Sequence, residues 1–421
     1  MEPETAGPNG QSALGAMDAP VSGPLAGLKV IELGHFVAAP FCTRLLADLG
    51  AEIIKVEPPT GDPVRQWGEL QDGHSPWWSM HGRNKRCITL DLKRPGAREV
   101  VLRLASGADA LVENFRAGQL DRFGLDAETL RAARPGLVIA RISGFGQSGP
   151  YRDRSSFGVI GEAMGGLRYL TNHPPELTAL PPSRTGISIG DSIAGLYAAF
   201  GLMAALWQRD RAGGSAKGYT VDVALTESVL SMMEGLLPEY GTFGTVRQPQ
   251  GARIKTAAPT SAYPTLDGGW LLIAANSEPL FRRLCHVIER PELASDPRFA
   301  DNAGRLSNVE ALDAIIADWS RSRSAGEAAA LLEAADIPAS LAYTAADIAA
   351  DPQYRERGMV REIDDPLIGP TLHAGIVPLV PEAPGAIRWP GRAIGADTDA
   401  VLLEAGFEPS EIDALRAQGV V

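Results

Sequence analysis

The sequence predicts an α/β fold, with a doubly wound, mostly parallel sheet followed by a smaller α+β domain. From Leu28 onward, short apolar runs alternate with helix-like stretches, which is the pattern of strands joined by helical crossovers. Such crossovers cover both faces of a sheet, so its strands are expected to be buried. Around Asp267, a hairpin followed by helices replaces the alternation and indicates the second domain.

The elements of the large sheet follow one another in order. Strands are expected at 28–34, 51–57, 87–92, 108–114 and 137–143. Helices are expected between them at 40–48, 96–105 and 127–133. After Gly186 we expect one more apolar strand, and then a long helix that begins near Asp191. A further strand is expected at 218–225, and the helix after it runs through Met233.

The chain divides into five predicted parts. Residues 1–23 are small, polar and rich in Pro and Gly, so we expect a disordered tail that cannot bury enough apolar surface to fold. A large domain is expected at 24–225, a linker at 226–257 and a small α+β domain at 258–336 with helices at 278–288 and 306–321. The last part, 337–421, carries short strands and a C-terminal helix, Pro409–Ala417, capped by Ser410.

Composition narrows the class of function. The 421 residues are 45% hydrophobic and 21% charged, which is typical of a globular protein with a large core. A formal charge of -12 disfavours a general nucleic-acid binder, since such a protein needs a basic surface against the phosphate backbone. The apolar run 193–207 contains two glycines and is too short for a membrane span, so we expect a buried helix there.

Cysteine and histidine usage argues against disulfide and metal sites. Cys42, Cys87 and Cys285 are scattered and form no CxxC pair, which favours a reducing, cytoplasmic location. The six histidines lack the spacing of a zinc site, so no metal is expected. The N-terminal residues also lack the basic start and apolar run of a secretory signal.

Two glycine motifs match known fingerprints by spacing. Residues 144–149 fit GxGxxG after a strand, but no helical pattern follows, and a dinucleotide site needs a helix there to hold the pyrophosphate. Residues 186–190 fit GxSxG, the turn that carries the nucleophile of many hydrolases. The expected strand places Ser188 before that turn. His286 or His373 would complete a triad, so a serine hydrolase or thioesterase stays an alternative.

Asp191 is the first candidate for covalent chemistry. A carboxylate at a strand-to-helix turn of a parallel sheet lies at the carboxyl edge, where ligands bind in such folds. Gly190 beside it admits a substrate close to the backbone. A carboxylate can also form an acyl intermediate by direct attack. The alternative is that Asp191 only caps the helix, which is a common role for Asp.

A basic cluster precedes the third expected strand. Arg83, Lys85 and Arg86 place three cations within four residues, and we expect them in a loop. They would neutralise the phosphates of a nucleotide-like cofactor, Arg by bidentate bonds and Lys as a point charge. The alternative is a solvated loop without a ligand.

In combination, several segments resemble the family III CoA-transferases (the CaiB/BaiF family), which include formyl-CoA and carnitine CoA-transferases. The resemblance covers nearly everything after residue 24. It is carried by LAGLKVIELGHFVAAPFCTRLLADLGAEIIKVEPPTGD, NKRCITLDLK, ALVENFRAGQLDRFGLD, GFGQSGPYRDR, GISIGDSIAGLYAAFGLMAAL and AADIAADPQYRERGMV. Because these segments match in order, the resemblance is more specific than any single motif.

The resemblance implies an enzyme in which Asp191, in the GDS turn, is the nucleophile. Its carboxylate would attack an acyl-CoA thioester to give an aspartyl mixed anhydride and CoA thiolate. An aspartyl-CoA thioester would follow, and CoA would pass to a free carboxylic acid. CoA-contacting positions of the family match Leu90, Asn114, Phe115 and Arg122 here. Coenzyme A is therefore expected as a substrate, with no permanently bound cofactor.

The resemblance also implies an interlocked homodimer. In the family, the N- and C-terminal parts build a Rossmann-like large domain and the middle builds a small one, so 337–421 would return to the large domain. The active site would lie between the large domain of one subunit and the small domain of the other. No nucleic acid or membrane partner is expected.

Two departures from relatives bear on the reaction. No glycine-rich lid loop is recognisable at 251–270, and Val37 stands where formyl-CoA enzymes have glutamine, which argues against oxalate or formyl-CoA specificity. The related α-methylacyl-CoA racemases have a histidine before a second acidic residue where this chain reads Ser156-Phe157-Gly158. Racemase activity is therefore not expected, although Glu162 keeps it as an alternative.

The expected acid is a dicarboxylate such as succinate, malate or itaconate, with succinyl-CoA as an expected donor. Arg168 or Arg184 would pair bidentately with its distal carboxylate, and Gly190 would make room for it. The alternative is that both arginines are structural or bind a CoA phosphate. A CoA-binding protein without catalytic activity is the remaining hypothesis.

Overall fold

The structure is a computed structural model that describes residues 22–213 and 217–421. The predicted disordered tail, 1–23, lies outside the described residues apart from its last two. The chain forms two compact units. The first comprises the residues up to Leu167, Thr185–Glu234 and Gln353–Val421, and the second comprises Arg168–Arg184 and Gly235–Pro352. The predicted boundaries of the five parts of the chain stay a prediction.

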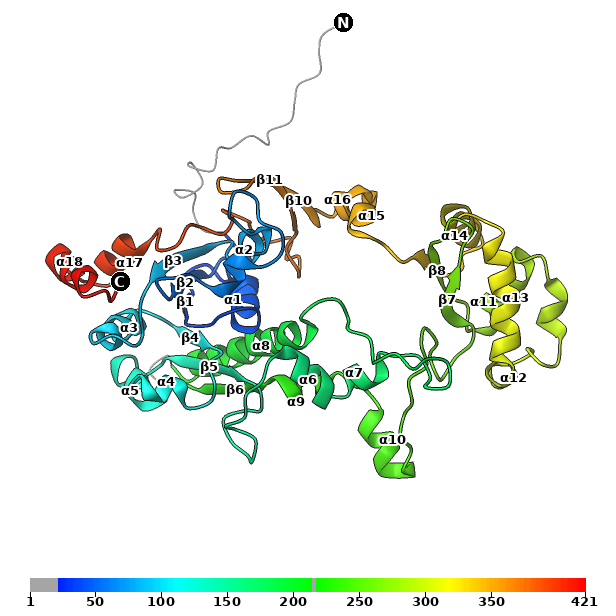
Figure 1. The fold of residues 1–421 in the computed structure, drawn as a ribbon, viewed down its shortest axis with the longest axis horizontal. Helices are drawn as coiled ribbons and strands as arrows, with labels where there is room; N and C mark the ends of the chain where they lie inside the picture. The colour runs from blue at the N-terminus through cyan, green and yellow to red at the C-terminus, as the bar shows by residue number, and fades with distance from the viewer. Residues whose placement is uncertain (1–21, 214–216) are drawn as a thin grey trace, which may run out of the picture. The chain divides into compact units, whose positions relative to one another are not determined.

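The first unit is built on a six-stranded sheet in the order β3-β2-β1-β4-β5-β6 (Figure 1). Every neighbouring pair of strands is parallel. The strands are β1 (Lys29–Glu32), β2 (Glu52–Glu57), β3 (Lys85–Thr89), β4 (Ala110–Glu113), β5 (Val138–Ser143) and β6 (Thr220–Ala224). This confirms the predicted parallel α/β sheet. The strand order reverses between β1 and β4, which makes that position the switch point at which such sheets bind ligands.

The strand expected after Gly186 is absent, and this prediction was wrong. Gly186 has a φ of 83°, a left-handed turn conformation, and only two residues separate it from the helix that follows. Ser188 then takes the N-cap position of helix α8 (Ile189–Arg211). The alternation of Ile187 and Ile189 imitated a strand, although these residues lie in the approach to the helix and in its first turn.

The helices of the first unit connect these strands. They are α1 (Ala38–Asp48), the 3-10 helix η2 (Pro63–Gln66), α2 (Pro76–His81), α3 (Ala97–Ser106), α4 (Gln119–Arg122), α5 (Ala127–Ala133), α6 (Gly158–Met164), α8, α9 (Leu225–Ser231), α16 (Pro352–Glu356), α17 (Thr398–Glu404) and α18 (Pro409–Ala417), with α7 (Leu167–Leu170) at the boundary. Helix α9 ends at Ser231, two residues before the predicted Met233. Helix α18 is capped by Glu408 in a capping box with Glu411, so the predicted Ser410 cap was wrong.

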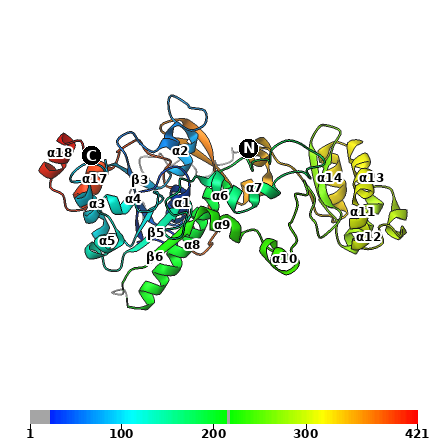
Figure 2. The ribbon, with the colours of Figure 1, turned by 60° about the horizontal axis from the view of Figure 1, so that its bottom comes forward.

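Two apolar cores lie on opposite faces of this sheet. On one face, Val30 belongs to a core shared with α1 and α8. On the other, its neighbour Ile31 belongs to a core shared with α3, α5, α17 and α18. Figure 2 shows α8 beside β5 and β6 on its own face. Because successive side chains of a strand point to opposite faces, coverage on both sides explains why the strands are apolar throughout.

Helix α8 is longer than the sequence suggested. Its 23 residues are long and apolar enough to cross a membrane by length and composition alone, so the prediction that this run is too short was wrong. Ala194, Ala198 and Leu202 are completely buried against the sheet and α1, which is the environment of a core helix.

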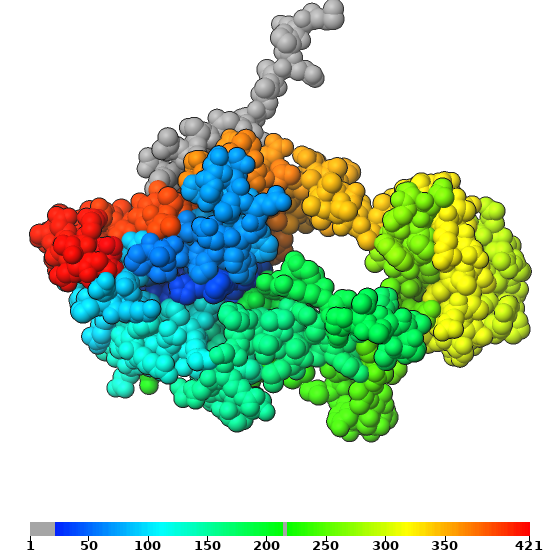
Figure 3. All heavy atoms as spheres, viewed as in Figure 1, coloured from blue at the N-terminus to red at the C-terminus, as the bar shows by residue number. Residues whose placement is uncertain are grey.

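The C-terminal segment belongs to the first unit. It begins with the antiparallel hairpin β10 (Val360–Asp365) and β11 (Gly369–Ala374). Farther along, the Arg392 carbonyl accepts a hydrogen bond of 2.8 Å from the Trp78 indole, and an Asp397 carboxylate oxygen accepts one of 2.8 Å from the Cys87 amide. Figure 3 shows this orange-to-red segment lying against the blue N-terminal elements. Residues more than 300 positions apart therefore share one core.

The second unit has its own sheet and core. Strands β7 (Thr260–Pro264), β8 (Trp270–Ala274) and β9 (Ala339–Leu341) form an antiparallel sheet in that order, which confirms the predicted hairpin around Asp267. Its helices are α10 (Leu236–Phe243), α11 (Glu278–Val287), the 3-10 helix η3 (Pro291–Ser295), α12 (Asn302–Ser307), α13 (Val309–Arg321), α14 (Ala325–Ala334) and α15 (Ala345–Ala350). Tyr263, Phe281 and Ile316 are among the buried residues that join sheet and helices.

Candidate functional site

A pocket of about 590 Å³ lies at the carboxyl ends of the strands of the first unit. Leu33 and His35 follow β1, Asn114 follows β4, and these two strands flank the switch point of the sheet. Residues after β2, β3, β5 and β6 complete the wall. The residues that line the pocket include His35, Phe36, Leu90, Lys93, Asn114, Phe115, Arg116, Arg152, Arg154, Ser155, Ser156, Phe157 and Asp191. The predicted ligand edge of the sheet is therefore hollow.

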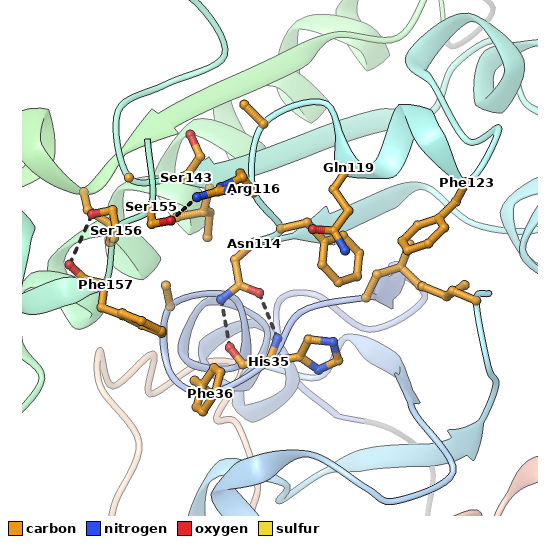
Figure 4. Close-up of a pocket in the computed structure, with 18 of the residues that line it drawn as sticks. His35, Phe36, Asn114, Arg116, Gln119, Phe123, Ser143, Ser155, Ser156 and Phe157 are labelled. Carbon is orange, nitrogen blue, oxygen red and sulfur yellow. Dashed lines mark hydrogen bonds between the residues drawn. The ribbon is translucent and has the colours of Figure 1, made fainter. Parts of the chain in front are cut away.

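Asn114 holds the loop after β1 in place. Its side-chain oxygen accepts a hydrogen bond of 2.8 Å from the His35 amide, and its side-chain nitrogen donates one of 2.8 Å to the His35 carbonyl (Figure 4). Phe36, next in the chain, has a φ of 62°, a conformation that costs free energy in a residue with a side chain. The Phe36 amide is held in turn by Asp62 at 3.2 Å. The loop is therefore fixed from both sides.

A buried network of charged side chains also contacts the loop after β1. The Lys55 ammonium lies 2.7 Å from Glu32, 2.6 Å from Asp62 and 2.6 Å from the Gly34 carbonyl. Burial alone would raise the pKa of Glu32, but the nearby ammonium groups of Lys55 and Lys85 hold it below its usual value. Burial lowers the pKa of His35, and the positive charge of Lys55 lowers it further. His35 therefore lines the pocket as a neutral imidazole.

Asp191 lines the pocket from the first turn of α8. The N-cap position belongs to Ser188, so the alternative that Asp191 is the cap was wrong. The carboxylate lies directly over Gly158, since a methyl group built there would approach Asp191 Oδ2 to 2.0 Å. A methyl group on Gly190 would approach the Gly158 carbonyl oxygen to 2.7 Å. Gly190 thus lets α6 and α8 meet beside the candidate nucleophile.

The pocket wall carries cations that the sequence did not single out. Lys93, Arg116, Arg152 and Arg154 line it. Arg116 donates a hydrogen bond to the Ser155 hydroxyl, and the Arg154 guanidinium lies 3.6 Å from the centre of the Tyr151 ring. These cations follow the ends of β3, β4 and β5 in the sequence. Basic residues after the ends of parallel strands were therefore the signal that could have found them.

The predicted cluster of Arg83, Lys85 and Arg86 lies elsewhere and has another role. Lys85 and Arg86 belong to β3, not to a loop. Arg83 and Lys85 are completely buried and pair with Asp48 at 2.6 Å and with Glu32 at 2.8 Å. Their charges are thus already neutralised inside the protein, and none of the three residues lines the pocket. The prediction that they face a ligand's phosphates is corrected for Arg83 and Lys85.

Arg86 is partly buried and pairs with Glu52 at 3.1 Å and with Glu404 at 2.6 Å. These partners lie on β2 and α17, so Arg86 ties the C-terminal segment to the sheet. Two acidic partners leave its charge compensated as well. It therefore has no place in the candidate site.

The remaining predicted contacts divide between the two units. Leu90, Asn114 and Phe115 line the pocket. Arg122 is exposed on α4 and does not line it, although Gln119 and Phe123 of the same turn do. Arg168 and Arg184 belong to the second unit, and neither lines the pocket of the first unit.

The alternative motifs find no support in the geometry. The glycines of 144–149 are followed by turns, and the next helix along the chain begins only at Gly158, so the loop does not open directly into a helix as a dinucleotide site requires. His373 is buried with its Nε2 atom 2.9 Å from Ser79, and His286 lies in the second unit. Ser188 is therefore not part of a triad with His373.

Metal chemistry also lacks a ligand set. Across 22–213 and 217–421, no group of three or more His, Cys, Asp or Glu side chains is arranged to hold a metal ion. The pocket instead combines the Asp191 carboxylate in a helix turn with four cations, two further acidic residues (Glu57 and Asp91) and apolar side chains. This arrangement can bind an anionic, partly apolar ligand and expose it to a carboxylate nucleophile.

Known proteins resemble the chain over most of its length. The model of the CoA-transferase family III matches residues 25–398. The succinyl-CoA–D-citramalate CoA-transferase of Chloroflexus aurantiacus is 42% identical over 401 residues, which are 94% of this chain and 98% of that protein. The acetyl-CoA:oxalate CoA-transferase of Acetobacter aceti is 35% identical and spans 80% of this chain and 85% of its own. A crystal structure of a CAIB/BAIF family protein from Brucella suis superposes with a TM-score of 0.81 at 33% identity, covering 91% of this chain and 100% of that one.

Proposed function

The chain belongs to the CoA-transferase family III and is an enzyme that transfers coenzyme A, and we propose that Asp191 is its nucleophile and succinyl-CoA its donor. One observation carries the proposal. Asp191 lies in a pocket at the carboxyl edge of the sheet whose wall holds Lys93, Arg116, Arg152 and Arg154. The pocket thus combines a nucleophile with a binding surface for a polyanionic thioester.

The proposed reaction divides one exchange into easier steps. A carboxylate oxygen of Asp191 attacks the thioester carbon, the C–S bond breaks, and CoA leaves as the thiolate. The thiolate attacks the aspartyl carbonyl of the resulting anhydride and releases the donor acid, which leaves an aspartyl-CoA thioester. The acceptor carboxylate attacks that thioester to form a second anhydride and free thiolate. The thiolate then takes the acceptor acyl group, so acceptor-CoA is released and the Asp191 carboxylate is restored.

The pocket cations are the proposed partners of the CoA phosphates. Arginine guanidinium groups bind phosphate oxygens bidentately, and a lysine ammonium acts as a point charge. The predicted contacts Leu90, Asn114 and Phe115 line the same pocket, and Phe115 packs edge-on to His35 with ring centroids 5.5 Å apart. We propose that these residues contact the less polar parts of CoA and that Arg122, at the exposed end of α4, meets a phosphate. Coenzyme A is a substrate here, and no permanently bound cofactor is proposed.

The proposed acceptor is a dicarboxylic acid. Relatives are named for D-citramalate, L-malate, mesaconate and oxalate, and three of these named activities use succinyl-CoA. A second carboxylate on donor and acceptor needs a cation to pair with it. We propose Arg168 or Arg184 of the second unit for this role, with Gly190 leaving room beside Asp191. A racemase is less well supported, since Ser156, Phe157 and Gly158 offer no proton-transfer base.

A CoA exchange assay tests this function. The purified chain is incubated with succinyl-CoA and each of D-citramalate, L-malate, mesaconate and oxalate, and the CoA esters are separated by liquid chromatography. We expect transfer to at least one hydroxy- or methyl-substituted dicarboxylate and a loss of about 10³-fold or more in Asp191→Ala. Ser188→Ala is the matched control and should retain transfer. Loss of activity in Ser188→Ala with activity retained in Asp191→Ala would establish the hydrolase-like alternative instead.

A homodimer in the cytoplasm completes the proposal. Leu196, Phe200 and Trp207 form an exposed apolar stripe on α8, with 54%, 72% and 67% of their surfaces accessible. We propose that a second copy of the chain covers this stripe. Light scattering should then give twice the mass of one chain, and Phe200→Asp should shift it to the monomer. A wild-type chain that is monomeric would contradict the homodimer. The three buried free cysteines agree with a reducing compartment.

A further inference from the structure

Helix α6 presents a line of glycines to α8 and α9. Gly158, Gly161 and Gly165 lie three and four residues apart, so they share one face of the helix. A methyl group at Gly161 would approach the Leu225 carbonyl oxygen to 3.0 Å, and one at Gly165 would approach Val229 to 2.5 Å. The missing side chains at these positions therefore let α6 pack closely against α9.

The first glycine of this line meets the candidate nucleophile. Gly158 is buried, and a methyl group there would lie 2.0 Å from Asp191 Oδ2, 2.7 Å from its Cγ and 3.2 Å from its amide nitrogen. The Asp191 carboxylate thus occupies the space that any other side chain at position 158 would fill. The backbone of Gly158 does not need a glycine for its own sake, because its φ lies outside the left-handed range. Alanine would ordinarily favour a helix at such a position.

From this contact we propose that Gly158 is a positioning residue for the covalent step. The space left by its missing side chain is the seat of the Asp191 carboxylate, which can therefore keep its position in the pocket wall. A methyl group at 158 would displace the carboxylate from this position or push α6 away from α8. The inference rests on the proposed function, because it gives the position of the nucleophile a cause.

The first test is the rate at which the covalent intermediate forms. Gly158→Ala is mixed with succinyl-CoA, the reaction is quenched at intervals, and the modified fraction of the peptide containing Asp191 is measured by mass spectrometry. We expect the rate and kcat to fall about 100-fold, the loss typical of a reacting group displaced by about 1 Å. The KM for succinyl-CoA should change by less than about twofold, since the CoA contacts are untouched. The matched control is Gly326→Ala in the first turn of α14, where a methyl group meets nothing within 4 Å.

The second test does not depend on activity. The melting temperatures of wild type, Gly158→Ala, Asp191→Ala and the double variant form a thermodynamic cycle. We expect Gly158→Ala to lower the melting temperature of the wild type by about 2–4 °C. In the Asp191→Ala background the same change should cost nothing, because the methyl group then fills the space left by the carboxylate.

The outcomes distinguish a failure of the proposal for Gly158 from a failure of the proposed function. Wild-type kinetics in Gly158→Ala would show that Gly158 does not position Asp191. Equal losses of melting temperature in the wild-type and Asp191→Ala backgrounds would show the same. Either result would leave the proposed CoA-transferase chemistry in place. A wild-type enzyme that exchanges CoA without any adduct at Asp191 would overturn the proposed nucleophile. The melting cycle would then still decide whether Gly158 seats the Asp191 side chain.

Discussion

Two groups of cations in the first unit differ in role. The structural group, Arg83 and Lys85, is completely buried and paired with Asp48 and Glu32. The pocket group is Lys93, Arg116, Arg152 and Arg154, all at the carboxyl edge of the sheet. The structural group already has its counter-ions within the protein, whereas the pocket group borders an open cavity. A run of Lys and Arg in a sequence therefore shows only that positive charge is present. The burial of each side chain and its acidic partners decide whether that charge is available to a ligand.

The largest expected effect comes from breaking the structural group. Lys85→Met removes a buried cation and leaves Glu32 with Lys55 as its remaining counter-ion, so the free energy of unfolding should fall by about 3–5 kcal/mol. Chemical denaturation measures this loss. The matched control is Lys93→Met in the pocket group, which should change stability by less than about 0.5 kcal/mol. Equal stabilities of the two variants would show that the two groups of cations do not differ in their contribution to stability.

The stability of the protein should depend on pH through His373, a buried histidine influenced by the charge of Arg83. Burial, together with the positive charges of Arg83 and Arg44, lowers the pKa of His373 to about 4. In the unfolded chain its pKa is about 6.5, so the unfolded state binds the proton more readily. The free energy of unfolding is therefore highest, as far as His373 is concerned, above pH 6.5. It falls by about 3 kcal/mol as the pH falls toward 4, because the unfolded chain then takes up the proton.

Replacing this histidine should remove that part of the pH dependence. His373→Gln should lose less stability than the wild type between pH 7.5 and pH 4.5, as measured by denaturation at each pH. The control is His286→Gln, at an exposed position on α11, which should follow the wild type. A His373→Gln profile parallel to that of the wild type would mean that the burial of His373 contributes nothing to acid sensitivity.

The pocket group should affect binding and not stability. Arg116→Ala should weaken CoA binding about tenfold through the loss of a charged hydrogen bond, with an unchanged melting temperature. Isothermal titration with CoA at two salt concentrations measures both the loss and its electrostatic origin. Arg86→Ala is the matched control and should bind CoA as the wild type does. Weaker binding in Arg86→Ala than in Arg116→Ala would restore the cluster that the sequence suggested.

The smallest effect is expected from a change at Asn114, which holds the loop after β1 beside the pocket. Asn114→Asp keeps the acceptor for the His35 amide but loses the donor to the His35 carbonyl. We expect a loss of about 1 kcal/mol in stability, because one neutral hydrogen bond disappears. Amide hydrogen exchange of His35 and Phe36 should become faster. Unchanged exchange in this loop would show that Asp62 alone is sufficient to hold it.

The parallel sheet could be predicted because its signals are local. Apolar runs bounded by helical patterns at 51–57 and 137–143 became β2 and β5 with boundaries shifted by one residue at most. The strand expected after Gly186 failed because alternating isoleucines fit the start of a helix as well as a strand, and α8 already begins at Ile189. Ser410 failed as a cap because Glu408 and Glu411 satisfy the helix start reciprocally.

The candidate site was predictable only in part. The sequence placed Asp191 at the edge of the sheet through a preceding strand that is absent, but the structure still brings Asp191 into one pocket with Leu90, Asn114 and Phe115. The cations Arg152 and Arg154 were missed because a loop without periodicity gives no orientation. Lys85 was misread because its counter-ion, Glu32, lies 53 residues away in the sequence. Pairing between distant charges is a tertiary property that spacing does not encode.

Peptide mass spectrometry after incubation with succinyl-CoA shows whether Asp191 carries the transferred CoA. We expect a CoA or succinyl adduct on the peptide that contains Asp191, present in the wild type and absent in Asp191→Ala. An adduct on a peptide that contains Ser188 or another nucleophile but persists in Asp191→Ala, or full turnover by Asp191→Ala, would rule out Asp191 as the nucleophile.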